Sequence, residues 1–240
     1  MEISKYLYLT LNLGSISIPL LYSIFEKDFH FIQYFKKVII AITMIAIPFL
    51  IWDAFFTEMG VWGFNADYHL SLEILGMPIE EWMFFFCIPY ACIFTHEVLK
   101  FYLPNYKLSR KNTINLSVFL LLVITILLVF NLGKWYTSVN FVWFILLLSY
   151  SLKNQIIALQ SYFPSFLIIL IPFFIVNGVL TGSFIENPVV WYNNEENIGV
   201  RLFTIPLEDV FYAFNLLFSI QLIFNLLSAK NEVHVTEKIR

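Results

Sequence analysis

Long apolar runs separated by short polar segments dominate the chain. A run of about 20 apolar residues is long enough to cross the hydrocarbon core of a bilayer as a helix. Only Lys153, Asn154 and Gln155 interrupt the fifth and sixth runs. The pattern predicts an all-α integral membrane protein with seven transmembrane helices. We place them at residues 4–25, 38–57, 80–102, 113–132, 137–153, 162–180 and 207–228.

Composition supports this fold class. Of the 240 residues, 60% are hydrophobic and 13% are charged, whereas about a quarter of a soluble domain is charged. The runs are continuous, so the alternating strands of a β-barrel are not expected. No basic tract or Gly-rich phosphate loop is present, which argues against nucleic-acid partners. The first run follows no basic segment or cleavage site, so we expect it to be retained as a span.

Lysine and arginine are distributed unequally between the two sides of the predicted bundle. The loops after the first, third and fifth spans and the C-terminal segment carry eleven of the 14, and the opposite side carries Lys5, Lys134 and Arg201. Positively charged loops stay in the cytoplasm. We therefore expect a multi-pass cell membrane protein with its N-terminus outside and its C-terminus in the cytoplasm.

A sequence repeat divides the spans into two units. "GMPIEEWMFF" (76–85) recurs as "TIPLEDVFYA" (204–213), so that Glu80 matches Glu208 and Glu81 matches Asp209 at an offset of 128 residues. We expect a first three-helix repeat at 1–103, a linker with the fourth helix at 104–136, a second repeat at 137–228 and a cytoplasmic tail at 229–240. The extra crossing makes the two repeats parallel, with a pseudo-two-fold axis along the membrane normal. The two acidic pairs then lie at the same depth.

The acidic pairs are the candidate chemistry. Proline followed by glutamate is also an ordinary helix start, but a doubled acid in both copies favours a functional role, because ionisable groups in membrane segments usually face an interior cavity. Helical spacing from Glu208 reaches Tyr212, Asn215 and Ser219, a polar stripe. We therefore expect Glu80 and Glu208 to face inward, with Glu81 and Asp209 as their supporting partners.

Aromatic side chains near the acids could stabilise a cation through their π-faces. The candidates are Trp82, Phe84, Phe211 and Tyr212, with Asn215 as a further lining residue. Phenylalanine is common throughout the chain, with 27 copies, so most of these rings serve packing. No metal-binding cluster is recognisable, and "HEVLK" (96–100) lacks the second histidine of a zinc-protease motif.

The two P-x-E-(E/D) motifs, each opening an aromatic membrane helix, resemble the integral-membrane lycopene cyclase family in its fused, single-chain form. The resemblance extends from about Lys5 to Leu227. The first unit is the closer match, through "WDAFFTEMGVWGFN" and "MPIEEWMFFFCIPYACIFTHE". The second keeps "IPLEDVFYAF" but has Asn177 in place of Asp53 and a longer loop.

The resemblance implies a reaction and a set of residues. An isolated terminal double bond of lycopene is protonated, the cation closes a ring, and a proton is lost to give a β-ionone ring, without redox cofactor or metal. The carried-over catalytic residues are Glu80, Glu81, Glu208 and Asp209, in one composite site. Partners would be the lipophilic carotenoid and membrane lipid, and contact with other enzymes of the pathway is left open. Apart from the resemblance, a supporting role is expected for residues at the level of the acids, namely Asp53, Thr57, Trp62, Asn65 and Asn177, with an interfacial anchor as the alternative for Trp62.

Other functions use the same features differently. A carotenoid hydratase or an ε-type cyclase would form the same cation and end the reaction in another way. A proton-coupled transporter also suits parallel repeats with acids between them, but it should have polar groups along a path to both faces. A retinal protein needs a lysine inside its last helix, and residues 207–227 contain none.

Overall fold

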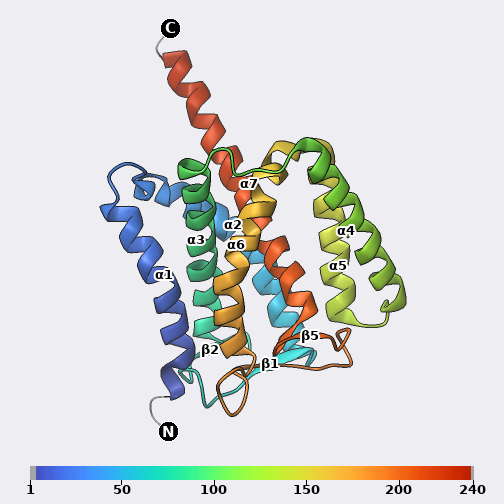
Figure 1. The fold of residues 1–240 in the computed structure, drawn as a ribbon. Coiled ribbons are helices and arrows are strands. Elements are labelled where there is room, and N and C mark those ends of the chain that lie inside the picture. Colours follow the sequence, from blue (N-terminus) through green and yellow to red (C-terminus); the bar gives the residue numbers. More distant parts are fainter. Residues whose placement is uncertain (1–3, 239–240) are drawn as a thin grey trace.

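The computed structural model describes residues 4–238, and from residue 230 onward it describes only the course of the helix. Seven helices form an elongated bundle (Figure 1), and each is long and apolar enough to cross a membrane. The predicted all-α membrane fold and all seven predicted spans are confirmed. The helices are α1 (Leu7–Phe25), α2 (Phe35–Glu58), α3 (Ile79–Tyr102), α4 (Arg110–Phe130), α5 (Trp135–Asn154), α6 (Ile156–Leu180) and α7 (Leu207–Lys238).

Most boundaries lie within three residues of the prediction, and two differ by more. Helix α6 begins at Ile156, six residues earlier than expected, because the polar break shrinks to Gln155 alone. Helix α7 continues to Lys238 through most of the predicted tail, since residues 207–238 contain neither proline nor glycine to end it. The last two residues of that predicted tail lie outside the described part of the chain.

Short strands cap the end of the bundle that also carries the N-terminus (Figure 1). Each repeat forms a small hairpin just before its last helix, and a third pair of strands joins the two repeats. The hairpins are β2 (Glu73–Ile74) with β3 (Met77–Pro78), and β5 (Arg201–Leu202) with β6 (Ile205–Pro206). The joining pair is β1 (Trp62–Phe64) with β4 (Val190–Tyr192).

The β1–β4 pair marks the pseudo-two-fold axis. Gly63 lies opposite Trp191, its own counterpart at the offset of 128. The backbone N–H of Asn65 donates to Val189 O at 2.8 Å, and the equivalent N–H of Asn193 donates to Val61 O at 2.9 Å. Each repeat thus makes the same bonds to the other, as in an isologous interface. The predicted parallel repeat is confirmed, and only glycine fits at position 63, because a Cβ there would meet the Trp191 ring at 2.4 Å.

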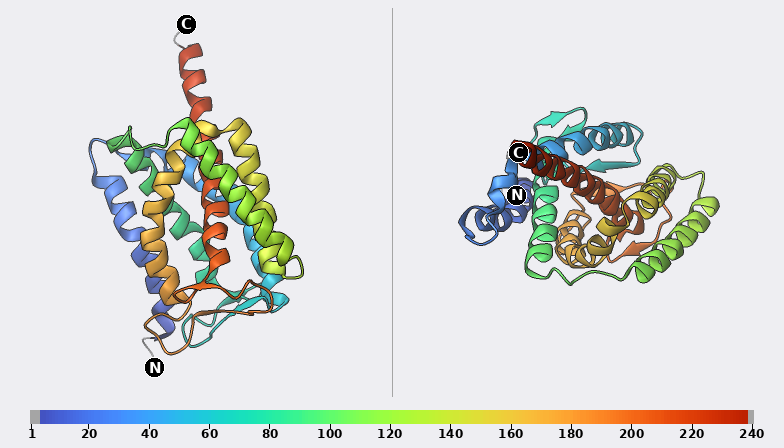
Figure 2. Two further views of the ribbon diagram at one scale, coloured as in Figure 1. Left: turned by 45° about the vertical axis from the view of Figure 1, so that its right-hand side comes forward. Right: turned by 90° about the horizontal axis from the view of Figure 1, so that it is seen from above.

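The repeats interlock rather than stand side by side. Within them, α1 packs on α3 and α5 packs on α7. Between them, α2 packs on α7 and α3 on α6. Figure 2 shows α4 on the outside of the bundle against α5, as expected of a linking helix. Helices α3 and α7, which begin with the acidic pairs, are therefore central.

Candidate functional site

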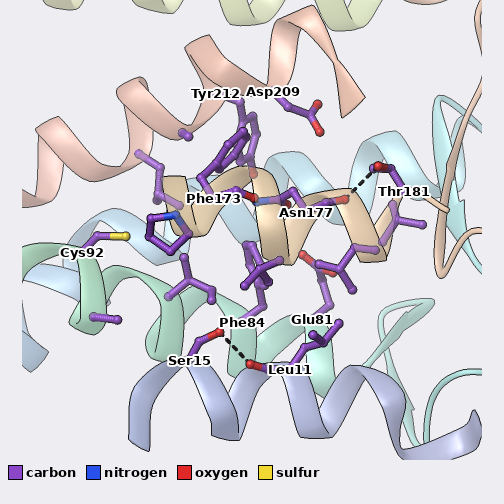
Figure 3. Close-up of a pocket in the computed structure, with 18 of the residues that line it drawn as sticks. Leu11, Ser15, Glu81, Phe84, Cys92, Phe173, Asn177, Thr181, Asp209 and Tyr212 are labelled. Carbon is purple, nitrogen blue, oxygen red and sulfur yellow. Dashed lines mark hydrogen bonds between the residues drawn. The ribbon is translucent and has the colours of Figure 1, made fainter. Parts of the chain in front are cut away.

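A cavity of about 500 Å³ lies among α1, α3, α6 and α7. Apolar side chains form most of its wall, including Leu11, Phe84 and Phe173 (Figure 3). Its polar end lies near the β-capped end of the bundle, where the helices α3 and α7 begin. Three carboxyl groups line this end, from Asp53, Glu81 and Asp209. The cavity therefore combines an apolar body with a concentration of acids at one end.

The structure reverses the expected direction of the acidic pairs. Glu80 and Glu208 are fully buried and do not line the cavity. Each accepts a hydrogen bond from the loop that precedes its helix, from Leu70 N to Glu80 Oε1 and from Ile198 N to Glu208 Oε1, both at 2.7 Å. The prediction that this pair faces inward is wrong, because the loop folds back over the first turn and needs an acceptor there.

The polar stripe that suggested the inward direction has a structural explanation. Asn215 Nδ2 donates to Asn140 O at 3.0 Å and to Asn140 Oδ1 at 2.8 Å. Asn140 in turn donates to Glu208 O at 2.7 Å, and Asn12 donates to Glu80 O at 2.8 Å in the first repeat. These amides tie α1 to α3 and α5 to α7, so Asn215 serves helix packing and does not line the cavity.

A substitution series separates the two acids of each pair. We expect Glu80→Gln and Glu208→Gln to keep most of the activity, because the amide oxygen still accepts the loop N–H. Glu80→Ala should destabilise the protein by about 1–3 kcal/mol, since it leaves the Leu70 N–H unpaired. Thermal unfolding in detergent and activity in membranes measure the two effects. Inactivity of a stable Glu80→Gln protein would contradict this assignment.

Glu81 lies beside a second carboxyl group. The Tyr8 hydroxyl donates a hydrogen bond to Glu81 Oε2. The Asp53 side chain is within hydrogen-bonding reach of Glu81, and Trp62 Nε1 donates to Asp53 Oδ1 at 2.6 Å. Asp53 Oδ2 has no N–H or O–H donor among the described residues.

Asp209 has a different environment, made of two phenols. Tyr136 donates to Oδ1 at 2.5 Å and Tyr192 donates to Oδ2 at 3.0 Å. Burial, and after it the charge of Asp209, raises the pKa of the Tyr192 hydroxyl well above its ordinary value, so this group stays protonated and remains a donor. Both oxygens of Asp209 thus accept from a hydroxyl, which stabilises the carboxylate.

The symmetry of the repeat is broken around the acids. The counterpart of Tyr192 at the offset of 128 is Phe64, which has no hydroxyl, and the counterpart of Trp62 is Val190. The first repeat therefore gives Glu81 one phenol and one carboxyl neighbour. The second gives Asp209 two phenols. Two chemically different carboxyl groups face the same cavity.

The remaining predicted residues divide between the cavity and the scaffold. Phe84, Tyr212, Trp62 and Asn177 line the cavity together with Asp53. Trp82 donates to Ile74 O of the hairpin, and Phe211 packs on Phe141 and Phe144. Asn65 Oδ1 accepts from Asp67 N within its own loop at 3.0 Å. The Thr57 hydroxyl is buried and has no hydrogen-bond partner among the residues described.

Sequence reasoning missed the tyrosines that hold the acids. Tyr8 and Tyr136 stand 128 residues apart, at the offset of the acidic motifs, and so do Asn12 and Asn140. Extending the repeat comparison into the first helix of each unit would have found both pairs. The counterpart of Tyr192 is Phe64, so the comparison gives no such signal for Tyr192.

A membrane bundle that encloses an apolar cavity with carboxyl groups at one end is suited to proton chemistry on a lipophilic molecule. A family model described as lycopene cyclase matches residues 5–99 and 133–227. The two matched segments start 128 residues apart and correspond to the two repeats. The chain belongs to the lycopene cyclase family.

A curated relative is the "Bifunctional lycopene cyclase/phytoene synthase" of Aspergillus niger (strain ATCC MYA-4892 / CBS 513.88 / FGSC A1513). It is 34% identical over 83 residues, which span 32% of this chain and 14% of the relative. The chain thus corresponds to a small part of that protein. No solved structure matches.

Proposed function

We propose that the protein is a lycopene β-cyclase, an enzyme of the intramolecular lyase or isomerase type. The observation that carries the proposal is the apolar cavity that ends at Glu81 and Asp209, in a chain that belongs to the lycopene cyclase family. An apolar body suits a polyene, and acids at one end suit chemistry confined to the terminal group of that polyene. The products are γ-carotene and β-carotene.

The proposed reaction is redox-neutral. The acid gives a proton to one carbon of the terminal double bond, which leaves a tertiary cation on the other carbon. The neighbouring double bond attacks this cation, a carbon–carbon bond closes the ring, and the positive charge moves into the ring. A base removes a proton from an adjacent carbon, and a ring double bond forms. One proton enters and one leaves, so the product is an isomer of the substrate.

Glu81 and Asp53 together supply the acid in this proposal. Asp53 is 4% exposed and Glu81 is 8% exposed, and two neighbouring carboxyl groups in such a site titrate as one unit. The two carboxyl groups share one proton in this proposal, and that proton supplies the donor that Asp53 Oδ2 lacks among the described residues. Glu81 touches the substrate, and Asp53, held by Trp62, positions the proton.

Asp209 is the base. Its two phenol donors favour the ionised form, and the negative charge of that form also stabilises the cation that forms. The rings of Trp62, Phe84 and Tyr212 line the cavity nearby and stabilise the same positive charge. Glu80 and Glu208 act indirectly, because they fix the first turns of the helices that carry Glu81 and Asp209.

We also propose an orientation of the protein in the membrane. The distribution of lysine and arginine supports an outer location for the N-terminus and for the strand-capped end of the bundle. The acids then lie near the outer leaflet, and the carotenoid arrives from the lipid. Lipid and carotenoid are the proposed partners, and the repeat boundaries 1–103 and 137–228 are the proposed functional units.

The direct test is expression in a lycopene-accumulating host. We expect conversion of lycopene to γ-carotene and β-carotene, measured by chromatography of extracted pigments. An acyclic hydroxylated product would identify a hydratase, and an ε-ring would identify a different cyclase. Unchanged lycopene, with the protein present in the membrane, would contradict the proposal.

A further inference from the structure

The acidic end of the cavity lies at the pseudo-two-fold axis, where Glu81 and Asp209 both line it, but its apolar body extends to one side only, along α1 and α6. Ser15 and Gly14 of α1 line it, and their counterparts on α5 at the offset of 128 are Trp143 and Val142. A small residue on α1 thus corresponds to the largest side chain on α5. The repeat therefore does not provide two equivalent chambers.

Aromatic rings fill the symmetry-related space. The Trp143 ring packs against Phe49 with centroids 5.0 Å apart and lies parallel to Trp52 at 6.4 Å. Phe49 also contacts the Tyr212 ring at 5.2 Å. None of Trp143, Phe49 and Trp52 lines the cavity. These three rings, which we call the aromatic plug, close the second chamber.

The open chamber reaches the surface of the bundle between α1 and α6. Gly14 and Ile18 of α1 and Pro172 of α6 all line the cavity and are all exposed; Ile18 is 74% exposed. These positions belong to membrane spans, so the opening faces lipid. Figure 3 shows Ser15 on α1 and Phe173 on α6 around the cavity, with Glu81 toward its acidic end.

The opening suits a long apolar ligand better than a compact one. Cavity-lining residues on α1 run from Tyr8 to Pro19, a rise of about 16 Å along the helix. This is about half of the hydrocarbon thickness of a bilayer. An extended polyene with its end at the acids therefore passes out of the cavity and into the lipid.

We propose that the chain has a single productive chamber, which takes one end of the carotenoid at a time from the lipid through the opening between α1 and α6. This inference rests on the proposed cyclase function and deepens it. A bicyclic product then requires the monocyclic molecule to leave, turn around and bind again. The aromatic plug prevents both ends from being held by the two repeats together.

The test introduces a tryptophan of the aromatic plug at the equivalent position of the open chamber. Ser15→Trp places on α1 the residue that occupies the equivalent position of α5, and we expect at least a tenfold loss of cyclised product and of lycopene that co-purifies with the protein. Ser17→Trp is the matched control, because Ser17 is exposed on the same helix and does not line the cavity. It should behave as wild type.

A second blocking variant guards against misfolding. A Cβ at Gly14 meets no atom within 4 Å, so the backbone position accepts a side chain, and Gly14→Phe adds a ring at the mouth of the cavity. We expect the same loss as for Ser15→Trp, with normal amounts of protein in the membrane. In a time course of the wild type, monocyclic product should precede bicyclic product.

The outcomes separate the inference from the function. If wild type cyclises lycopene and both blocking variants do so equally well, the proposed chamber is wrong and the cyclase function stands. If wild type cyclises nothing, the function fails, and the lycopene that co-purifies with wild type and with Gly14→Phe still decides where the polyene binds. Bicyclic product without any monocyclic precursor would overturn the single-chamber proposal.

Discussion

Replacing Glu81 with Gln is expected to abolish cyclisation. The amide keeps the shape of the side chain and an oxygen that accepts from Tyr8, but it cannot hold the proton shared with Asp53. Loss of a general acid typically lowers a rate by about 10²–10⁴-fold, and here protonation starts the reaction, so we expect the upper part of that range. The measurement is the amount of all cyclised carotenoids per amount of protein in isolated membranes supplied with lycopene.

Glu73→Gln is the control for this variant. Glu73 lies in the hairpin just before α3 and is exposed, so the same chemical change there should leave the rate unchanged. Asp53→Asn should give a smaller loss than Glu81→Gln, since Asp53 positions the proton without giving it to the substrate. Full activity of a Glu81→Gln protein would remove Glu81 from the proposed mechanism.

The fold could be predicted because it follows from periodicity and repetition. The lengths of the apolar runs set the seven helices, since a bilayer allows few other solutions. The motif at Glu80 and its copy at Glu208 set the parallel repeat, and the β1–β4 register centred on Gly63 confirms it. These features depend on the chain's own pattern and need no knowledge of the loops.

The site could be predicted only in part, because loop geometry decides which acid faces the cavity. Helical spacing gives the angle between Glu80 and Glu81 but not the direction of the neighbouring loop. The backbone N–H of Leu70 donates a hydrogen bond to Glu80 at 2.7 Å and holds its side chain against the loop. The next residue, Glu81, then faces the cavity. The polar stripe that contains Asn215 predicted a cavity wall. The hydrogen-bonded amides of Asn215 and Asn140, which join α7 to α5, produce the same sequence pattern.

Broken symmetry between the repeats distinguishes the acid from the base in the proposed mechanism. Two identical carboxyl groups in one cavity would compete for the same protonation state, whereas an acid and a base must differ. Tyr192 in place of Phe64 on the second repeat, and Asp53 beside Glu81 on the first, create that difference. The plug at Trp143 adds a second asymmetry, which leaves one chamber for the two unlike acids to share.

Replacing Asp209 with Asn is expected to change the product as well as the rate. The acid at Glu81 is intact, so the cation still forms and the ring still closes. The base is missing, so the proton leaves from a different neighbouring carbon or water adds to the cation. We expect a rate about 10²–10³-fold lower and a larger share of rings with a displaced double bond or a hydroxyl group, measured by chromatography and mass spectrometry of the pigments.

This outcome distinguishes the base from the acid, because Glu81→Gln should give little product of any kind. Glu195→Gln, an exposed change in the loop that carries Tyr192, should leave both rate and product unchanged. Tyr192→Phe removes one of the two phenol donors and should shift the products in the same direction as Asp209→Asn, to a smaller extent. If Asp209→Asn instead gives only β-rings at the full rate, another group removes the proton, and the two carboxyl groups must exchange or share their roles.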